Sequence, residues 1–375
     1  MSVNMGNVLG LIFANMHDKT CDDLTKSRTM GSVLFGGRYR LIDFPISNMA
    51  NSGVSEVGVI TKSNYQSLLD HLGSAREWDL SRKKGGLHIL PPFGHVGSGL
   101  YRGRLEAMYG AMSFIKSSQA DYVILSDCDI IANIDYKPIV QAHIDTGADI
   151  TVVCQKGNYS SEEIAASTVL AVNDQNKVYD VLIAPNLSGT CIISMNMFVM
   201  KKDFLLDMLQ IAMARSEYSF ERDLLQAKCK ELNIIAYEYE NFMRKIYSMK
   251  SYYETNMELL TPEITRKLFH TRRPIYTKVR DNPPAKYGID CKVTNSLIAD
   301  GCIIEGEVEN SILFRGVKVG KGAKIKNSIL MQDTTVGDKS EINYIITDKN
   351  VNISNFRLLT GSESYPLYVG KGASI

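Results

Sequence analysis

The segment Asn310-Ser311-Ile312-Leu313 recurs seventeen residues later as Asn327-Ser328-Ile329-Leu330, and Asn295-Ser296-Leu297-Ile298 is a variant of it. A Val-Gly pair follows each of the two full copies, at Val319-Gly320 and Val336-Gly337. Aliphatic residues recur through the region at spacings of five or six: Val308, Leu313, Val319, Ile325, Leu330, Val336 and Ile342. Near-hexapeptide repeats that bury one aliphatic residue per side predict a parallel β-helix with three short sides per turn.

An antiparallel sandwich is the alternative for this region. It would show alternation of period two without a repeat that stays in phase, so we favour the β-helix, over residues 286–375. Stacked coils leave an unpaired edge at each end, and such edges must be capped or paired with another chain. The repeat therefore also predicts oligomerisation.

The residues before the repeat show a different pattern. Short apolar runs alternate with segments of helical period up to about Leu260, which is typical of strand-helix units on a mostly parallel, doubly wound sheet. The expected strands are 8–14, 57–61, 122–125 and 150–153, and the clearest helices are 138–146 and 203–214. We predict an α/β domain over residues 1–261, followed by a linker over 262–285, where four prolines disfavour regular helix.

The composition limits the possible functions. The chain has 375 residues, and its 42 Lys plus Arg nearly balance 41 Asp plus Glu, so no overall field favours nucleic acid or an anionic membrane. The seven cysteines are odd in number and never spaced as Cys-x-x-Cys, which disfavours both a disulfide framework and a zinc site. The first apolar run is too short for a signal or membrane-spanning segment, so we expect a cytoplasmic protein.

The most specific motif is Phe35-Gly36-Gly37-Arg38-Tyr39-Arg40-Leu41-Ile42-Asp43-Phe44-Pro45-Ile46-Ser47-Asn48, followed by Asn51-Ser52-Gly53. It resembles the sugar-nucleotide pyrophosphorylases, and particularly the glucose-1-phosphate adenylyltransferase (ADP-glucose pyrophosphorylase) family. The resemblance covers essentially the whole chain. It implies a Rossmann-like nucleotide-diphospho-sugar transferase domain with a mixed sheet, followed by a left-handed parallel β-helix. It also implies a family reaction in which glucose 1-phosphate attacks ATP and pyrophosphate leaves, with carboxylates that hold Mg²⁺.

The phosphate-binding loop of that family is degenerate here. The family has a glycine-rich loop with an arginine after its first strand, and this chain has Asn15, Met16, Asp18 and Thr20 at those positions. Glycine alone allows the backbone to approach the phosphates closely, so Lys19 could restore a charge but not this geometry. The family's phosphate-contacting lysine after Arg28 is replaced by Met30.

Other family positions have changed as well. The base-binding segment corresponds to Gly103-Arg104-Leu105-Glu106-Ala107, where we expect Arg104 and Leu105 to crowd the pocket. The sugar-phosphate lysine corresponds to Ala184. At the family's first metal-binding position, this chain has two aspartates, Asp127 and Asp129, and either could match the family's ligand. At the family's second metal-binding position it has Lys245, whose positive charge would repel Mg²⁺.

The resemblance, together with these losses, implies a regulatory subunit without catalytic activity. Several missing charge contacts would each remove a few kcal/mol of transition-state stabilisation. We therefore expect this chain to hold no metal or cofactor and to activate a catalytic ADP-glucose pyrophosphorylase subunit, which binds the Mg²⁺, in a hetero-oligomer such as a tetramer used in glycogen biosynthesis. One alternative is an active nucleotidyltransferase with an altered site, which would use Asp127 or Asp129 for the metal and Lys19, Arg28 and Arg104 for the phosphates. Another is a sugar-phosphate or nucleotide sensor.

Four arginines are candidates for a phosphorylated effector between the domains: Arg38, Arg40, Arg272 and Arg273. In the family, the basic residue after the paired glycines belongs to such an effector region. The alternative is that they are solvated surface charges, with Arg40 a partner of Asp43. Asp43, Ser47 and Asn48 are predicted to support the fold rather than to catalyse.

Overall fold

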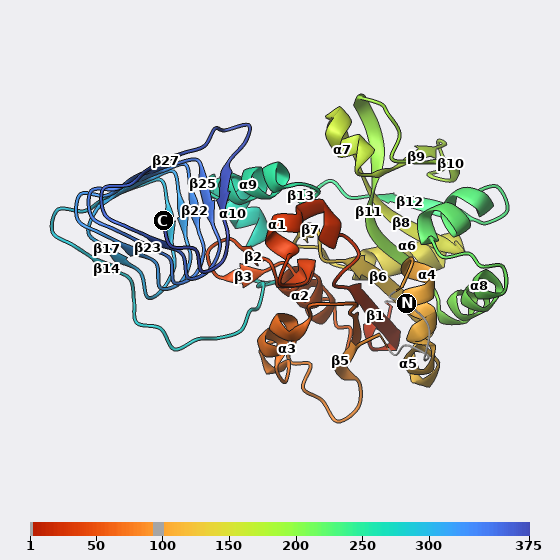
Figure 1. Ribbon diagram of the computed structural model, residues 1–375. Coiled ribbons are helices and arrows are strands. Elements are labelled where there is room, and N and C mark those ends of the chain that lie inside the picture. Colours follow the sequence, from red (N-terminus) through yellow and green to blue (C-terminus); the bar gives the residue numbers. More distant parts are fainter. Residues whose placement is uncertain (1–2, 93–100) are drawn as a thin grey trace.

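The computed structural model describes residues 3–92 and 101–375. An α/β domain is followed by a prism of short strands, and the two are packed against each other (Figure 1). The predicted strands and helices are present, with ends shifted by one or two residues, except that the strand predicted at 150–153 continues to Tyr159. They are β1 (Val8–Phe13), β4 (Glu56–Ile60), β6 (Tyr122–Asp127), β8 (Ile150–Tyr159), α6 (Lys137–Thr146) and α8 (Lys202–Ala214).

The main sheet is mixed. β1 lies between β4 and β6 and is parallel to both, and β5 (Gly86–Leu90) continues the parallel part beyond β4. On the other side β11 (Gly189–Lys201) runs antiparallel to β6 and joins it to the remaining strands. These are β8, β9 (Thr168–Val172), β10 (Val178–Ile183) and β12 (Ile234–Glu238). Parallel pairing is therefore confirmed for β6-β1-β4-β5 and for the neighbouring pair of β8 and β12, while the sheet as a whole is mixed.

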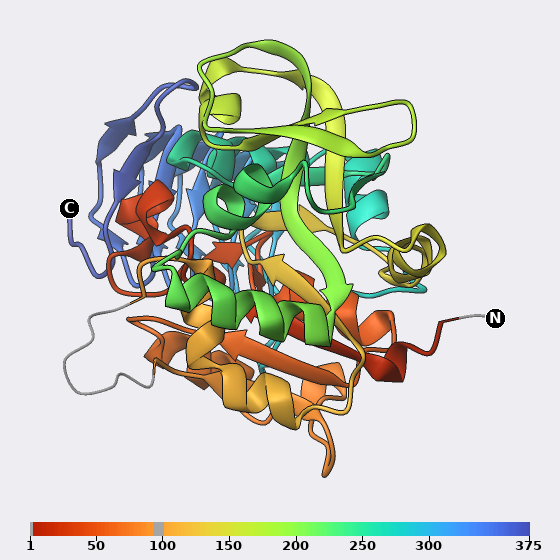
Figure 2. The same cartoon turned by 90° about the vertical axis from the view of Figure 1, so that its right-hand side faces the viewer.

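Helices cover both faces of this sheet. Successive side chains of a strand point to opposite faces, so Leu9 and Leu11 pack into one apolar cluster while Val8 and Ile12 pack into the other. Figure 2 looks onto the layer made by α4 (Arg104–Gly110), α5 (Met112–Ser117) and α8. The other layer contains α6 with α2 (Asp43–Asn51) and α9 (Met249–Glu258).

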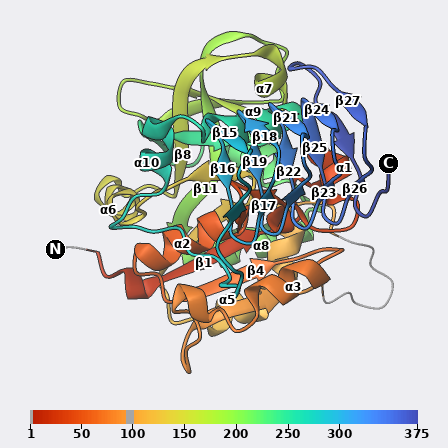
Figure 3. The same cartoon turned by 90° about the vertical axis from the view of Figure 1, so that its left-hand side faces the viewer.

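The C-terminal domain is the predicted left-handed parallel β-helix. Three sheets of five short parallel strands form its sides (Figure 3). One contains β14 (Lys286–Tyr287), β17 (Ile303–Ile304), β20 (Lys318–Val319), β23 (Thr335–Val336) and β26 (Asn352–Ile353). The second contains β15 (Lys292–Thr294), β18 (Glu307–Glu309), β21 (Lys324–Lys326), β24 (Glu341–Asn343) and β27 (Leu358–Thr360), and the third β16 (Leu297–Ile298), β19 (Ile312–Leu313), β22 (Ile329–Leu330), β25 (Ile345–Thr347) and β28 (Leu367–Val369).

The repeated Asn-Ser pair forms one corner of the prism. Asn295, Asn310 and Asn327 adopt positive φ angles of 42°, 45° and 46°, which asparagine tolerates better than most residues. Below them, the Ser311 hydroxyl donates to Glu309 O and accepts from Ser328 N of the next coil, at 2.7 and 3.1 Å. The pair therefore recurs because each corner needs both a left-handed residue and a small hydroxyl.

The two domains share one apolar core. Leu313 and Leu330 point into the prism, whereas the preceding Ile312 and Ile329 point outward and pack in the same cluster as Tyr252 of α9. Both members of each Ile-Leu pair are fully buried. The β-helix is thus joined to the α/β domain by packing as well as by the chain.

The predicted linker is partly wrong. Its first residues form α10 (Pro262–Leu268), with Pro262 in the first turn, where a proline costs no hydrogen bond. The remainder has no regular secondary structure before β14, and part of it contacts the α/β domain, where Asn51 Nδ2 donates to Pro274 O at 2.9 Å. The segment after α10, residues 269–285, is therefore packed in part against the α/β domain, and we call it the strap.

The remaining elements are short. They are the helices α1 (Asp22–Thr25), α3 (Gln66–Leu72) and α7 (Ser161–Ala165), a π-helix (Phe220–Gln226), the 3-10 helices Met5–Asn7, Asp18–Cys21, Met30–Ser32 and Arg76–Trp78, and the strands β2 (Leu34–Phe35), β3 (Tyr39–Arg40), β7 (Ile130–Ala132) and β13 (Met243–Lys245). All seven cysteines lie in the described ranges, and all are free thiols. No helix within those ranges has the length and apolar character needed to cross a membrane.

Candidate functional site

A cavity of about 810 Å³ opens beside the carboxyl ends of β1 and β4 and the start of α4. The segment predicted to correspond to the family's phosphate-binding loop lines this cavity. Its lining residues include Asn15, Met16, Asp18, Lys19 and Thr20. Lys62, Tyr101, Arg102 and Gly103 line the same cavity from other elements. The structure therefore brings these positions, predicted from the sequence, together at one cavity.

Side-chain oxygens of this segment accept hydrogen bonds from main-chain N–H groups beside the cavity. Asn15 Oδ1 accepts from Lys62 N at 2.9 Å, and Asp18 Oδ1 accepts from Met30 N at 2.7 Å. Asn15 Nδ2 donates to Asp18 Oδ2 at 2.6 Å and so ties the two side chains together. Burial raises the pKa of Asp18 to about 6 despite these bonds. The loop thus provides its own acceptors for donors that could otherwise face an anion.

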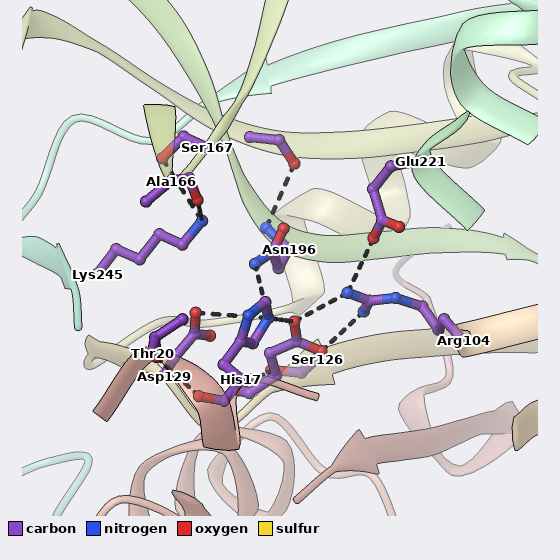
Figure 4. Close-up of polar contacts among 12 residues, drawn as sticks. His17, Thr20, Arg104, Ser126, Asp129, Ala166, Ser167, Asn196, Glu221 and Lys245 are labelled. Carbon is purple, nitrogen blue, oxygen red and sulfur yellow. Dashed lines mark hydrogen bonds and ion pairs between the residues drawn. The ribbon is translucent and has the colours of Figure 1, made fainter. Parts of the chain in front are cut away.

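Arg104 and Asp127 form a buried, two-pronged ion pair below the cavity. Arg104 Nη1 lies 2.7 Å from Asp127 Oδ1, and Nη2 lies 2.9 Å from Oδ2 (Figure 4 shows Arg104 and its contact with Glu221). Arg104 Nη2 also lies 3.0 Å from Glu221 Oε1. Burial opposes the charge of both groups, yet the pair raises the pKa of Arg104 and lowers the pKa of Asp127. Both oxygens of the retained aspartate are therefore occupied by a cation from the chain itself.

His17 extends this network toward Asp129. Its Nε2 lies 2.7 Å from Asp127 Oδ2 and 3.6 Å from Asp129 Oδ2. Asn196 of β11 approaches the same nitrogen, at 3.4 Å (Figure 4). Burial disfavours the charged imidazole, but Asp129 and Asp127 together raise its pKa. Burial also raises the pKa of Asp129, and His17 only partly offsets this effect.

Lys245 brings another positive charge to this region. It is buried on β13, and its Nζ donates to Ala166 O at 2.8 Å, with Ser167 Oγ at 3.5 Å (Figure 4). Its charge stabilises ionised Asp129 and opposes protonated His17. The lysine is therefore placed close enough to influence the group in which the family binds metal.

The residues present do not fit Mg²⁺. Within the described ranges, His17, Asp127 and Asp129 are the one group whose ligand atoms converge, all lying within 4.8 Å of one another. Mg²⁺ binds oxygen ligands that are free of other cations. Here the guanidinium of Arg104 already holds both oxygens of Asp127, and Lys245 adds a nearby positive charge. A divalent ion would have to displace Arg104 before it could bind.

Several predicted positions lie elsewhere. Arg104 and Leu105 do not crowd the nucleotide cavity, because both side chains point into the protein interior and neither lines it. Gly103 does have a packing role, since a Cβ there would collide with the carbonyl of Tyr218. Met30 is buried in the core, and Ala184 is exposed at the end of β10, outside both large cavities.

Arg28 is not a phosphate ligand in this arrangement. Its Nη2 lies 2.7 Å from Asp348 Oδ2 of the β-helix, and both side chains are 3 % exposed. The Tyr368 hydroxyl lies 2.9 Å from the same carboxylate oxygen and 3.0 Å from the carbonyl oxygen of Asp23. Arg28 therefore joins the two domains behind the cavity.

A second cavity, of about 450 Å³, lies on the other side of Lys245. Its charged lining includes Glu163, Arg244, Glu254 and Glu258. Arg244 is paired with Glu258, with Nε 2.9 Å from Oε2. Lys156 and Lys245 also line this cavity, so its three cations and three carboxylates are equal in number.

The four predicted effector arginines do not converge. Arg38 and Arg40 line a small cavity between the domains, but Arg272 is exposed elsewhere and Arg273 lies 3.8 Å from Asp135. The other cationic lining residues are Lys278, Arg280 and Arg315. The predicted Arg40–Asp43 contact exists only at the backbone, where Arg40 N donates to Asp43 Oδ2 at 2.9 Å. Arg40 Nη1 instead donates to Ser67 O and Oγ.

The sequence analysis missed other members of this basic group. Lys349 is largely buried near Arg40 and Arg28; burial and these charges lower its pKa to about 7. Burial lowers the pKa of Arg40 to about 10. Lys278 and Arg280 lie in the strap, where their spacing by two on an extended segment is the signal that could have identified them. Nothing local marks Lys349, because only the fold brings it here.

Comparison with known proteins gives matches in both domains. Residues 21–261 match the family described as nucleotidyl transferase, and residues 283–360 match the GlmU-like C-terminal hexapeptide family. A glycogen biosynthesis protein GlgD of Bacillus subtilis is 34% identical over 97% of this chain and 96% of its own length. A glucose-1-phosphate adenylyltransferase of Pseudothermotoga lettingae is 33% identical over 86% of this chain and 77% of its own length. A glycogen biosynthesis protein GlgD of Geobacillus stearothermophilus is 34% identical over 85% of this chain and 82% of its own length.

Proposed function

We propose that this chain, which belongs to the nucleotidyl transferase family and to its group of glucose-1-phosphate adenylyltransferases and GlgD proteins, is a regulatory subunit deficient in catalysis. It would bind a catalytic ADP-glucose pyrophosphorylase subunit in a hetero-oligomer, such as a tetramer, and activate it in glycogen biosynthesis. Mg²⁺ would be held by the catalytic partner. The similar identities to GlgD proteins and to the adenylyltransferases do not separate these two roles, so the proposal depends on the site.

The observation that carries the proposal is the pairing of Arg104 with Asp127. Nucleotidyl transfer to a sugar phosphate needs cations placed on the phosphates and carboxylates that hold the metal. In this chain, the carboxylate of Asp127 holds a guanidinium, and the side-chain oxygens of Asn15 and Asp18 take up donors of the protein itself beside the cavity. The family match also begins only at residue 21, after that loop.

The alternative of an active enzyme with altered chemistry is less well supported. It would use Arg28 and Arg104 for the phosphates and one aspartate for the metal. Arg28 is instead paired with Asp348, and Arg104 with Asp127, each in a buried contact. A phosphate that recruited either arginine would leave a carboxylate buried without its partner, which is strongly unfavourable.

A phosphorylated effector is the second part of the proposal. Arg38, Arg40, Lys278, Arg280 and Arg315 surround the small cavity between the domains, and Lys349 lies nearby. Like charges brought together repel one another, and an anion would relieve this repulsion. The cavity has a volume of only about 20 Å³, so the exposed Arg38 and Arg280 would have to move to admit a phosphate. The same group supports the alternative of a sensor.

Co-purification and kinetics test the proposal together. The pure chain is expected to form no ADP-glucose from ATP, glucose 1-phosphate and Mg²⁺, to co-elute with a catalytic subunit, and to raise the rate of that subunit. Pyrophosphate exchange by the pure chain would instead support the altered enzyme. No co-elution and no change in rate would reject the regulatory role, and binding of a sugar phosphate without either effect would favour the sensor.

A further inference from the structure

The carboxylates below the cavity are arranged as a cation site that is already occupied by a side chain. His17 Nε2, Asp127 and Asp129 present ligand atoms within 4.8 Å of one another, a spacing that one ion could bridge. The Arg104 guanidinium reaches Asp127 from one side at 2.7 and 2.9 Å. We propose that Arg104 is a built-in substitute for a divalent cation, and that its removal uncovers a metal site formed by His17, Asp127 and Asp129.

Asp129 is the independent observation that points to a missing ligand. Its side chain is 1 % exposed, and neither carboxylate oxygen has a hydrogen-bond partner. A buried carboxylate without partners is costly, and it normally binds a donor or a metal. Arg104 satisfies Asp127 and Glu221 but forms no ion pair with Asp129. The guanidinium of Arg104 therefore satisfies only part of this acidic group.

The surroundings of Arg104 explain why the substitution is stable. Its guanidinium carbon lies 4.8 Å from the centre of the Phe13 ring, with Phe198 and Phe220 also nearby, so the aromatic rings pack around the cation. Gly103 allows the start of α4 to approach Tyr218, and Leu105 N donates to Tyr218 O at 3.1 Å. The backbone thus fixes the position from which Arg104 reaches Asp127.

The charges of the group leave no place for a divalent ion beside Arg104. The cationic groups are Arg104, Lys245 and protonated His17, and the carboxylates are Asp127, Asp129 and Glu221. Opposite charges therefore balance one for one when all six groups are ionised. Adding a divalent ion beside Arg104 would create an excess of buried positive charge. Exchanging the ion for Arg104 keeps the balance, because His17 must release its proton to solvent before Nε2 can bind a metal.

Manganese binding to the full chain tests this inference, because free and bound Mn²⁺ are distinguished by electron paramagnetic resonance. The wild type is expected to bind no Mn²⁺ at this site. Arg104→Gln removes the charge but retains an amide that can donate to Asp127, and this variant is expected to bind one Mn²⁺ per chain. The double variant Arg104→Gln/Asp127→Asn is expected to lose it. Arg102→Ala removes an arginine that pairs with Glu106 outside the group and serves as the matched control.

Two results would overturn the inference. One is Mn²⁺ binding by the wild type that Asp127→Asn abolishes, because the site would then be available despite Arg104. The other is a folded Arg104→Gln variant that binds no Mn²⁺. If that variant unfolds in the presence of EDTA, Mn²⁺ is expected to restore its circular dichroism, but not that of the double variant; failure of this rescue counts against the inference. The test needs no catalytic subunit, so its outcome is independent of the regulatory proposal.

Discussion

Asp348 of the β-helix and Arg28 of the α/β domain form an ion pair of 2.7 Å with almost no access to solvent. The pair lies beside Lys349 and Arg40, so the carboxylate also offsets other positive charges in the domain interface. Lys349 N donates to the Asp348 carboxylate as well, at 2.7 Å. Asp348 is therefore a central acceptor between the two domains.

Replacing Asp348 by asparagine is expected to lower the free energy of unfolding by about 3 to 5 kcal/mol, because removal of one partner leaves buried cations uncompensated. Urea unfolding monitored by circular dichroism measures the loss. Glu341→Gln is the matched control, since Glu341 and Lys324 form an exposed pair of 3.3 Å. Exposed pairs contribute about 0 to 1 kcal/mol. Equal losses in the two variants would contradict the prediction.

Sulfate binding at the basic group is expected to weaken between pH 6 and pH 8. Lys349 has a pKa of about 7, lowered by burial and by Arg40 and Arg28, so it loses its positive charge over this range. The charge of sulfate does not change between pH 6 and pH 8. Burial lowers the pKa of the nearby His71 below its usual value, so titration of His71 is not expected to change the sulfate affinity as much as titration of Lys349 does. Calorimetric titration at both pH values measures the difference.

Two substitutions check the origin of that pH dependence. Lys349→Gln is expected to remove most of the difference between pH 6 and pH 8, because the titrating charge is then absent. Arg272→Ala is the control, since Arg272 is exposed and does not line the cavity. Sulfate affinity that is independent of pH in the wild type would show that Lys349 does not take part.

Ile329→Ala is expected to destabilise the protein as much as Leu330→Ala, by about 2 to 5 kcal/mol each, because both side chains are fully buried. Leu330 lies inside the prism and Ile329 lies in the core shared with the α/β domain. Ile303→Ala, at a side chain that is 38% exposed, is the control with a smaller loss. Urea unfolding is expected to occur in one transition, and separate transitions for the two domains would argue against a shared core.

The stability contribution of Asp18 is expected to decline as the pH rises. Its pKa is about 6 in the folded protein and 3.8 is its usual value, so the folded state binds more protons between these values. The contribution is complete below pH 3.8 and is lost as the pH rises through 6. Asp18→Asn should remove this trend from urea unfolding measured between pH 4 and pH 7, and an unchanged slope would contradict the raised pKa.

The sequence was sufficient for the fold where residues repeat with a fixed period. The aliphatic positions from Val308 to Ile342 predicted the prism because each coil imposes the same requirement on its neighbour. The same signal did not distinguish Ile312 from Leu313, since both are aliphatic and only the presence of the α/β domain buries the outward one. It also failed at α10, where Pro262 was taken as a helix breaker although it opens the helix.

The site was predictable as a set of positions but not as a set of contacts. The family motif located Asn15, Met16, Asp18 and Thr20, and the structure brings them to one cavity. The direction of the Arg104 side chain depends on Asp127 and Glu221, which lie on other elements, so it was not predictable from the sequence. Lys349 and His17 were missed for the same reason, because long-range packing alone defines their surroundings.

The contact from Tyr368 to the carbonyl oxygen of Asp23 spans 345 positions in the chain. A ribosome must therefore synthesise the chain as far as Tyr368 before the segment around Asp23, beside the large cavity, gains this contact. Until then that segment lacks this support, although β1 can already pair with β4 and β6. Newly made chains that stop short of the last coil would leave that segment unanchored and open to proteases.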